Sequence, residues 1–193
     1  MISATPVPAV QHARDAARFT ALVESAPAEG WSRPSPVVEW TALDIVKHLI
    51  EWSRGFLHGA GIALPALDVA TDPVSAWKQH VTDIQAILDE PAERVLSNPH
   101  IGDKPVDVAL DEFYTPDIWM HTWDLAKAFG REPDLDEQRC ADALAGMAPM
   151  EQMLRDSGQF GPAVPVAEDA SAQDKLMAFL GRDPAWHSPD PER

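Results

Sequence analysis

The segment from Thr115 to Gly130 carries three ionisable side chains on one face of a helix that is otherwise rich in apolar residues. At about 100° per residue, Asp117, His121 and Asp124 fall within roughly 60° of one another. Apolar helices are normally buried, and a buried ionisable group must be paired or must bind a metal. Asp117 precedes His121 by one helical turn, a spacing that lets two side chains reach one ion. The pattern therefore indicates either a ligand site or a hydrogen-bonded polar pair within the helix.

Two side chains do not complete a metal site, so a third ligand must come from another helix. The best-placed candidate is His48, in the stretch DIVKHLIEW. It lies on the border of an apolar arc, roughly 60° from Ile45 on a helical projection. The same position also suits a solvated or hydrogen-bonded histidine. Glu51 follows His48 by one turn, but it faces the polar edge of the helix, where a solvated carboxylate is expected.

Helices dominate the pattern of the whole chain. We expect them over residues 9–26, from 41 to about 60, from 72 through 88, over 115–129, over 136–155 with a break near Pro149, and from Ser171 to Gly181. Residues 106–129 are alternatively one long helix with a kink at Pro116. No segment alternates convincingly as a strand, and SNPHIGDKP is expected to be a connecting loop. The sequence predicts an all-α bundle of four main helices with additional C-terminal helices.

Local signals place the ends of the two helices that carry the candidate ligands. Thr41 can cap the first of them, and Asp44 then stands at the third helical position, as in a capping box. Thr115 can cap the second, with Pro116 in its first turn and Gly130 at its C-terminal exit. Both helices are therefore expected to begin at recognisable caps.

The length of 193 residues predicts one helical-bundle domain over residues 1–193, ordered from about 9 to 186, with a flexible tail over 187–193. A formal net charge of −16 argues against nucleic acid or an anionic membrane as a partner, since both repel such a surface. The N-terminus lacks the features of a signal peptide, and no apolar run is long enough to span a bilayer. We expect a cytoplasmic protein, and an exposed bundle face could support a homodimer.

Several other side chains are expected to have ordinary structural roles. Cys140 is the only cysteine, so no internal disulfide and no thiolate cluster can form, and a small core residue is expected. Trp119 and Trp123 are expected in the core or, alternatively, lining a pocket beside the candidate ligands. The histidines at positions 12, 58, 80, 100 and 187 are expected on polar faces, in loops or in the tail.

Two segments, WSRPSP…EWTALDIVKHL and DIWMHTWDLAKAFG, resemble the paired signatures of the DinB-like metal-binding bundles. The branch they resemble is the one related to mycothiol-dependent maleylpyruvate isomerase. The ending FGPAVPVAEDASAQDKLMAFLGRDPAW is similar to that of a small, largely uncharacterised actinobacterial subfamily of this group. The likeness spans about Ala9 to Trp186. It implies a DinB-like up-down four-helix bundle with additional C-terminal helices.

The resemblance also implies a divalent metal, often zinc, held by His48, Asp117 and His121. In the isomerase the carboxylate ligand is a glutamate, whereas this chain has an aspartate. Two imidazoles and one carboxylate suit zinc, nickel or iron better than calcium or magnesium. Three protein ligands leave a position open for water or substrate, as in a reactive site. Asp124 could then orient a ligating imidazole through its other nitrogen, or could make a hydrogen bond between helices.

Three functions remain open at this point. The first is a thiol-dependent transferase or isomerase, in which the metal binds a low-molecular-weight thiol such as mycothiol for attack on an electrophile. The second is a non-catalytic metal-binding or stress-response protein. The third is a helical interaction module in which Asp117 and His121 form a buried polar pair.

Overall fold

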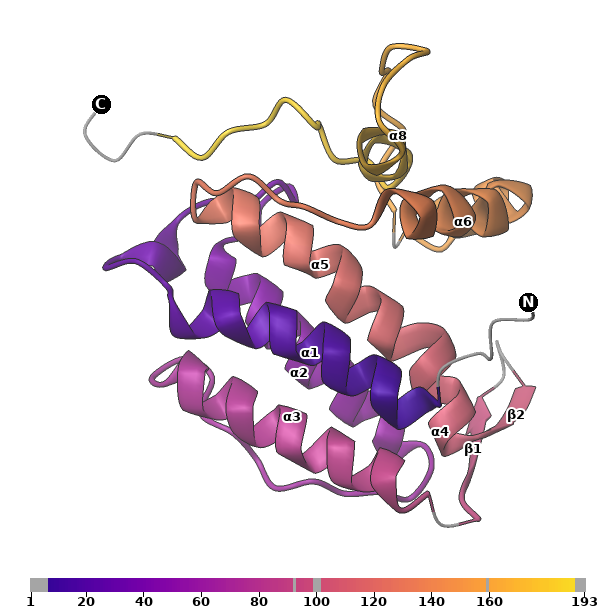
Figure 1. Cartoon of the computed structure of the whole chain (residues 1–193). Helices are drawn as coiled ribbons and strands as arrows, with labels where there is room; N and C mark the ends of the chain where they lie inside the picture. The colour runs from indigo at the N-terminus through magenta and orange to yellow at the C-terminus, as the bar shows by residue number, and fades with distance from the viewer. Residues whose placement is uncertain (1–6, 92, 99–101, 159, 190–193) are drawn as a thin grey trace.

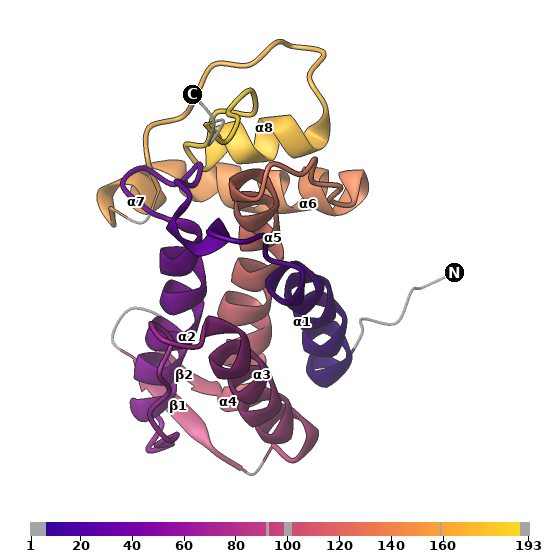
Figure 2. The same ribbon diagram turned by 90° about the vertical axis from the view of Figure 1, so that its left-hand side faces the viewer.

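The computed structural model describes residues 7–91, 93–98, 102–158 and 160–189. The helices α1 (Pro8–Glu24), α2 (Ala42–His58), α3 (Pro73–Asp89) and α5 (Thr115–Ala128) pack into a bundle, in which α1 and α2 each contact both α3 and α5 (Figure 1). A second layer lies across one end of the bundle and holds α6 (Glu137–Met147), η3 (Ala148–Met150), α7 (Glu151–Asp156) and α8 (Ala172–Phe179) (Figure 2). The predicted all-α bundle with additional C-terminal helices is confirmed.

Some sequence positions fall outside this description. Residues 190–193 of the expected tail and His100 are among them. No helix in the described ranges is both long enough and apolar enough to cross a membrane.

The start of α2 is fixed by the predicted capping box. The Thr41 hydroxyl accepts a hydrogen bond from the Asp44 backbone N–H at 3.3 Å, and the Asp44 carboxylate accepts one from the Thr41 N–H at 2.8 Å. Thr41 also pairs with Pro34 in an isolated antiparallel bridge, which holds the preceding loop against the helix. This loop includes η1 (Gly30–Ser32) and delivers Trp40 to the start of α2. The capping box and the bridge therefore fix the start of α2 and the backbone position of Trp40 beside it.

Residues 106–128 form one continuous helix, which agrees with the alternative of one long helix over 106–129. It begins as α4 (Val106–Ala109), passes through the π-helical turn η2 (Leu110–Tyr114) and continues as α5. Thr115 is therefore not a cap, and its buried hydroxyl has no hydrogen-bond partner. Pro116 has no N–H to donate to the preceding turn. The π-helical turn η2 lies just before it, so the backbone hydrogen-bond pattern of the helix changes where that donor is missing. The predicted C-terminal exit is confirmed, since Gly130 adopts a φ of 70°.

A short hairpin occupies the region where we expected a loop without strands, so that expectation is wrong. β1 (Val95–Asn98) pairs antiparallel with β2 (Gly102–Pro105), with Val95 opposite Pro105. Each strand has four residues, too few for a clear alternation of apolar and polar side chains. Of the two strands, β1 supplies the buried side chain of Leu96. These strands are defined by hydrogen bonds between their backbones, and a pattern of side chains does not predict such pairing.

Two apolar clusters lie on opposite sides of α5. The first fills the four-helix bundle and includes Ile118 and Leu125 of α5. The second joins α5 to the C-terminal layer and contains Trp119, Trp123, Leu135, Cys140, Leu176, Met177 and Leu180. Burial on both sides explains why α5 is apolar around most of its circumference.

The expectation that His12 and His80 lie on polar faces is wrong, since both side chains are completely buried. His12 lies on the same helical stripe as Phe19 of α1, and His80 stands between Trp77 and Ile84 on the inner face of α3. In each helix the apolar stripe includes one histidine, which then needs polar partners inside the core. The core role of Cys140 is confirmed, and burial raises the pKa of its thiol to about 12.

His80 is held as a neutral imidazole within a buried polar chain. The Arg54 Nε–H donates to His80 Nδ1 at 3.2 Å, so the ring hydrogen lies on Nε2, 2.8 Å from the Tyr114 hydroxyl. Burial, helped by the charges of Arg54 and His12, lowers the pKa of His80 from 6.5 to about 3. The unfolded chain therefore takes up a proton at this residue at a much higher pH than the folded protein does.

This difference predicts a loss of stability in acid. Between pH 6.5 and pH 3 the unfolded state binds the proton and the folded state does not, so the free energy of unfolding falls as the pH falls. From pH 7 to pH 4, wild type should lose about 3 kcal/mol more than His80→Gln. Urea denaturation at several pH values measures this, with His58→Gln as the control because His58 is exposed on α2. Parallel pH profiles for wild type and His80→Gln would contradict the prediction.

Candidate metal centre

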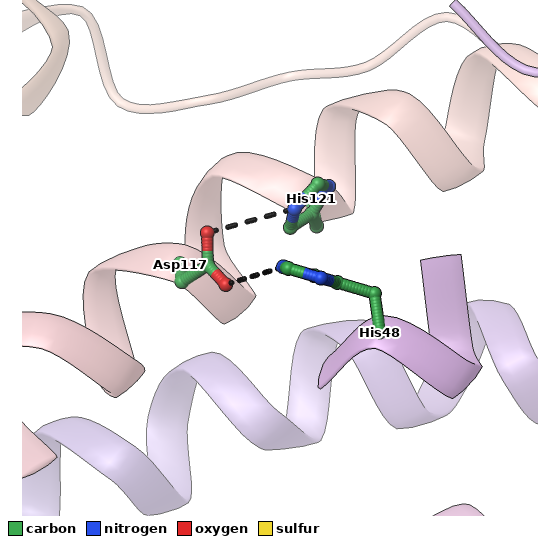
Figure 3. A group of neighbouring side chains, drawn as sticks. All are labelled: His48, Asp117 and His121. Atoms are coloured by element: carbon green, nitrogen blue, oxygen red, sulfur yellow. Dashed lines mark hydrogen bonds and ion pairs between the residues drawn. The ribbon is translucent and has the colours of Figure 1, made fainter. Parts of the chain in front are cut away.

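The three candidate ligands meet between α2 and α5 (Figure 3). His48 Nε2 lies 3.3 Å from Asp117 Oδ2, and His121 Nε2 lies 3.5 Å from Asp117 Oδ1. One ligand atom from each of the three residues falls within 4.8 Å of the others. The structure thus brings together side chains that are 69 positions apart in the sequence, on two different helices.

The spacing of these atoms fits a metal ion. Two ligand atoms at about 2.1 Å from a tetrahedral zinc ion are separated from each other by roughly 3.4 Å. The two nitrogen–oxygen distances, 3.3 Å to Oδ2 and 3.5 Å to Oδ1, are each close to that separation, and the three ligand atoms all lie within 4.8 Å of one another. The donor set of two imidazole nitrogens and one carboxylate is also one that zinc, nickel and iron accept.

Asp117 is stabilised as a carboxylate by the groups around it. Burial by itself raises the pKa of Asp117, but His121, then His48 and the Trp52 N–H outweigh it and lower that pKa below its ordinary value. The Trp52 Nε1–H donates to Asp117 Oδ2 at 2.9 Å. About one fifth of the Asp117 side chain remains exposed, at 21%. The carboxylate is therefore ionised and held in place while one side stays accessible.

His121 is oriented by a second carboxylate. Its Nδ1 lies 2.8 Å from Asp124 Oδ2, and the Asp124 side chain is 1% exposed. Burial raises the pKa of Asp124, but the Arg182 guanidinium and the hydrogen bond with His121 lower it below its ordinary value. An ionised Asp124 accepts the Nδ1–H of His121, which turns the Nε2 side of the ring toward Asp117. This contact is the one that the first of the two alternatives for Asp124 requires, in which its carboxylate orients the imidazole of His121.

Two tryptophans adjoin the three ligands, but they are not the two named from the sequence. The Trp40 ring centroid lies 4.9 Å from that of His48 and 6.0 Å from that of His121. Trp52 adjoins His48 from the next turn of α2. Trp119 and Trp123 instead lie buried in the second apolar cluster, against α6 and α8. They sit about 160° around α5 from His121, which turns them away from the ligands.

Trp40, Trp52 and Arg182 adjoin the site but are not among the site residues predicted from the sequence, which holds a weak signal for the two tryptophans. Trp52 follows His48 by four positions and so shares its helix face, which marks it as a neighbour of any ligand bound there. Trp40 immediately precedes the capping Thr41, a position that fixes its backbone. Nothing in the sequence pairs Arg182 with Asp124, 58 positions away. Glu51 is exposed and lies near Lys47, as expected for a solvated carboxylate.

Comparisons with known proteins identify a family for this chain. The family described as the mycothiol maleylpyruvate isomerase N-terminal domain matches residues 12–126, a range that includes all three candidate ligands. Two uncharacterised proteins of Mycobacterium tuberculosis, from strains CDC 1551 / Oshkosh and H37Rv, are each 29% identical to the chain over 181 residues. Each alignment covers 92% of this chain and 97% of the relative. No solved structure matches significantly.

The family match has a direct consequence for classification. It extends from within α1 through most of α5 and so contains nearly all of the four-helix bundle. It covers more than half of the chain, and the chain therefore belongs to the mycothiol maleylpyruvate isomerase N-terminal domain family.

Proposed function

We propose that this protein is a metal-dependent enzyme that activates a low-molecular-weight thiol for transfer to an electrophile or for thiol-assisted isomerisation. His48, Asp117 and His121 hold a divalent transition metal, with zinc as the first candidate and nickel or iron as alternatives. The observation that carries the proposal is the convergence of His48 Nε2 and His121 Nε2 on the two oxygens of one ionised carboxylate.

The donor set favours an open site. Within the described part of the chain, the group that could hold an ion has three members, which leaves a coordination position for a further atom. Structural zinc sites are usually closed by four side chains, often cysteines. Cys140 is buried in the second cluster and cannot serve here. A site with three protein ligands is the pattern of a reactive centre.

Exposure indicates the side from which a substrate would arrive. The His48 side chain is 32% exposed, whereas that of His121 is 5% exposed. The accessible side is therefore the one formed by α2, where Trp40 lies against His48. Its indole supplies an apolar wall beside the ligands and is suited to contact the carbon skeleton of a thiol or an electrophile.

Each residue then has a defined task. The chemistry supplied by the bound metal is to lower the pKa of a coordinated thiol, so that the thiolate attacks at neutral pH. Asp117 provides the negative charge at the site, and Trp52 keeps its carboxylate from rotating. Asp124 holds the His121 ring so that its Nε2 would be available to a bound ion. The family description, which names a mycothiol-dependent isomerase, supports a thiol such as mycothiol as the co-substrate.

The first test is the metal content of purified protein. Wild type should contain about one transition-metal ion per chain, because three ligands converge on one point. His48→Ala, Asp117→Ala and His121→Ala should each lose most of that metal in elemental analysis. His58→Ala is the matched control, since His58 is an exposed histidine on the same helix as His48. Wild type with well under one ion per chain, and unchanged by these substitutions, would support the buried polar pair instead.

The second test asks whether a thiol reaches the ion. Wild type loaded with Co²⁺ should develop a sulfur-to-cobalt charge-transfer band when mycothiol, cysteine or glutathione is added, because a coordination position is open. The loaded protein should then accelerate the reaction of the bound thiol with chlorodinitrobenzene or the isomerisation of maleylpyruvate. Absence of the band with every thiol would contradict the proposed thiol chemistry. A band without turnover of any electrophile would support the non-catalytic metal-binding alternative.

A further inference from the structure

Asp124 is held by a residue from the C-terminal layer. Arg182 donates to both of its oxygens, from Nε to Oδ1 at 3.3 Å and from Nη2 to Oδ2 at 3.2 Å. The third donor, Nη1, bonds the Leu180 carbonyl at 3.0 Å, so the guanidinium is fixed at both ends. Its side chain is 12% exposed, whereas that of Asp124 is 1% exposed. A buried carboxylate requires such compensation, and a bidentate arginine also fixes its orientation.

The backbone at the end of α8 places Arg182 where it can make these bonds. The Arg182 N–H bonds the Met177 carbonyl at 2.9 Å, and the Gly181 N–H bonds the Ala178 carbonyl at 3.1 Å. This is a Schellman motif, with Gly181 at a φ of 87°. A Cβ at Gly181 would lie 2.9 Å from the Cα of Gly161, so the close approach of these two glycines also requires the absence of a side chain. The position of Arg182 is therefore set by the fold of the C-terminal layer.

The C-terminal layer is in turn attached to α5 by apolar packing. Leu176, Met177 and Leu180 share the second cluster with Trp119 and Trp123. The two tryptophans occupy a different face of α5 from Asp117 and His121. Packing on one face of α5 therefore delivers a guanidinium to Asp124 on another.

We propose that Arg182 is a positioning residue of the metal centre, acting through Asp124 on the ring of His121. The contacts form a continuous series, in which Arg182 fixes Asp124 and Asp124 accepts the Nδ1–H of His121. The Nε2 side of the ring is thereby directed at Asp117, where the three candidate ligands would hold an ion. The inference rests on the proposed metal site. The residue it adds lies outside the family match, because the matched region ends at residue 126 and does not include Arg182.

Charge and orientation predict opposite effects of removing this arginine. The guanidinium repels a divalent cation, so its charge alone predicts tighter metal binding in Arg182→Gln. Loss of orientation predicts weaker binding, because Asp124 is then free to release the His121 ring. Groups that orient a ligand typically contribute about 10- to 100-fold to metal affinity. We expect the loss of orientation to dominate.

The test measures Co²⁺ affinity from the visible absorption of the protein–cobalt complex. Arg182→Gln should bind Co²⁺ about tenfold more weakly than wild type, and Asp124→Asn between about 10- and 100-fold more weakly. The double variant should bind no more weakly than Asp124→Asn alone, since both changes interrupt one series of contacts. Arg182→Lys should recover part of the affinity. A lysine keeps a positive charge that can pair with the Asp124 carboxylate, but it lacks the bidentate geometry of the guanidinium.

Arg139→Gln is the matched control. Arg139 lies in α6 of the same C-terminal layer and also makes a bidentate pair with a buried carboxylate, donating from Nη1 and Nη2 to the two oxygens of Asp15. This variant should lower the thermal stability, because Asp15 loses a charged partner, and should leave the Co²⁺ affinity unchanged. Unchanged or tighter binding in Arg182→Gln, or an equal loss in Arg139→Gln, would overturn the positioning role.

A metal-free measurement separates this inference from the proposed function. Ring ¹H and ¹⁵N chemical shifts should show the His121 Nδ1–H in a strong hydrogen bond in wild type and in a weaker one in Arg182→Gln. Wild type that binds no Co²⁺ would contradict the proposed function, while the ring measurement would still decide whether Arg182 positions His121. Identical ring shifts in the two proteins would overturn the inference even if both bind metal.

Discussion

The ionised carboxylate of Asp117, placed between two helices, is the constraint on which the rest of the site depends. A partly buried charge must be met by donors or a cation, and here the groups that meet it come from both α2 and α5. Trp52 donates to one oxygen, and His48 and His121 approach different oxygens. The capping box at Thr41 fixes the start of α2, so His48 and Trp52, one turn apart, both face this carboxylate.

The second structural feature is the double burial of α5. One side of this helix completes the core of the bundle, and another packs against α6 and α8. A helix held on both sides has little freedom to rotate, which keeps Asp117, His121 and Asp124 in a constant relation to α2. The C-terminal layer is therefore part of the environment of the site, although it contributes none of the three candidate ligands.

Much of the fold and of the site could be predicted, and each failure has a physical cause. The main helices, the capping box at Thr41 and the break near Pro149 follow from local spacing, and each is present. The hairpin of β1 and β2 was missed because it depends on backbone pairing between short segments. The polarity of histidine predicts His12 and His80 on the surface, but each side chain continues an apolar stripe of its helix and is buried.

The sequence by itself determined the helical class, the residue types at the site and the one-turn spacing of Asp117 and His121. These properties repeat along a single helix and are visible to a local pattern. Only the tertiary structure decided that His48 shares a point with them, that Trp40 and Trp52 adjoin the ligands, and that Arg182 holds Asp124. Those relations join residues from helices and loops far apart in the chain, and the packing between elements, rather than the periodicity within one, fixes which of them meet.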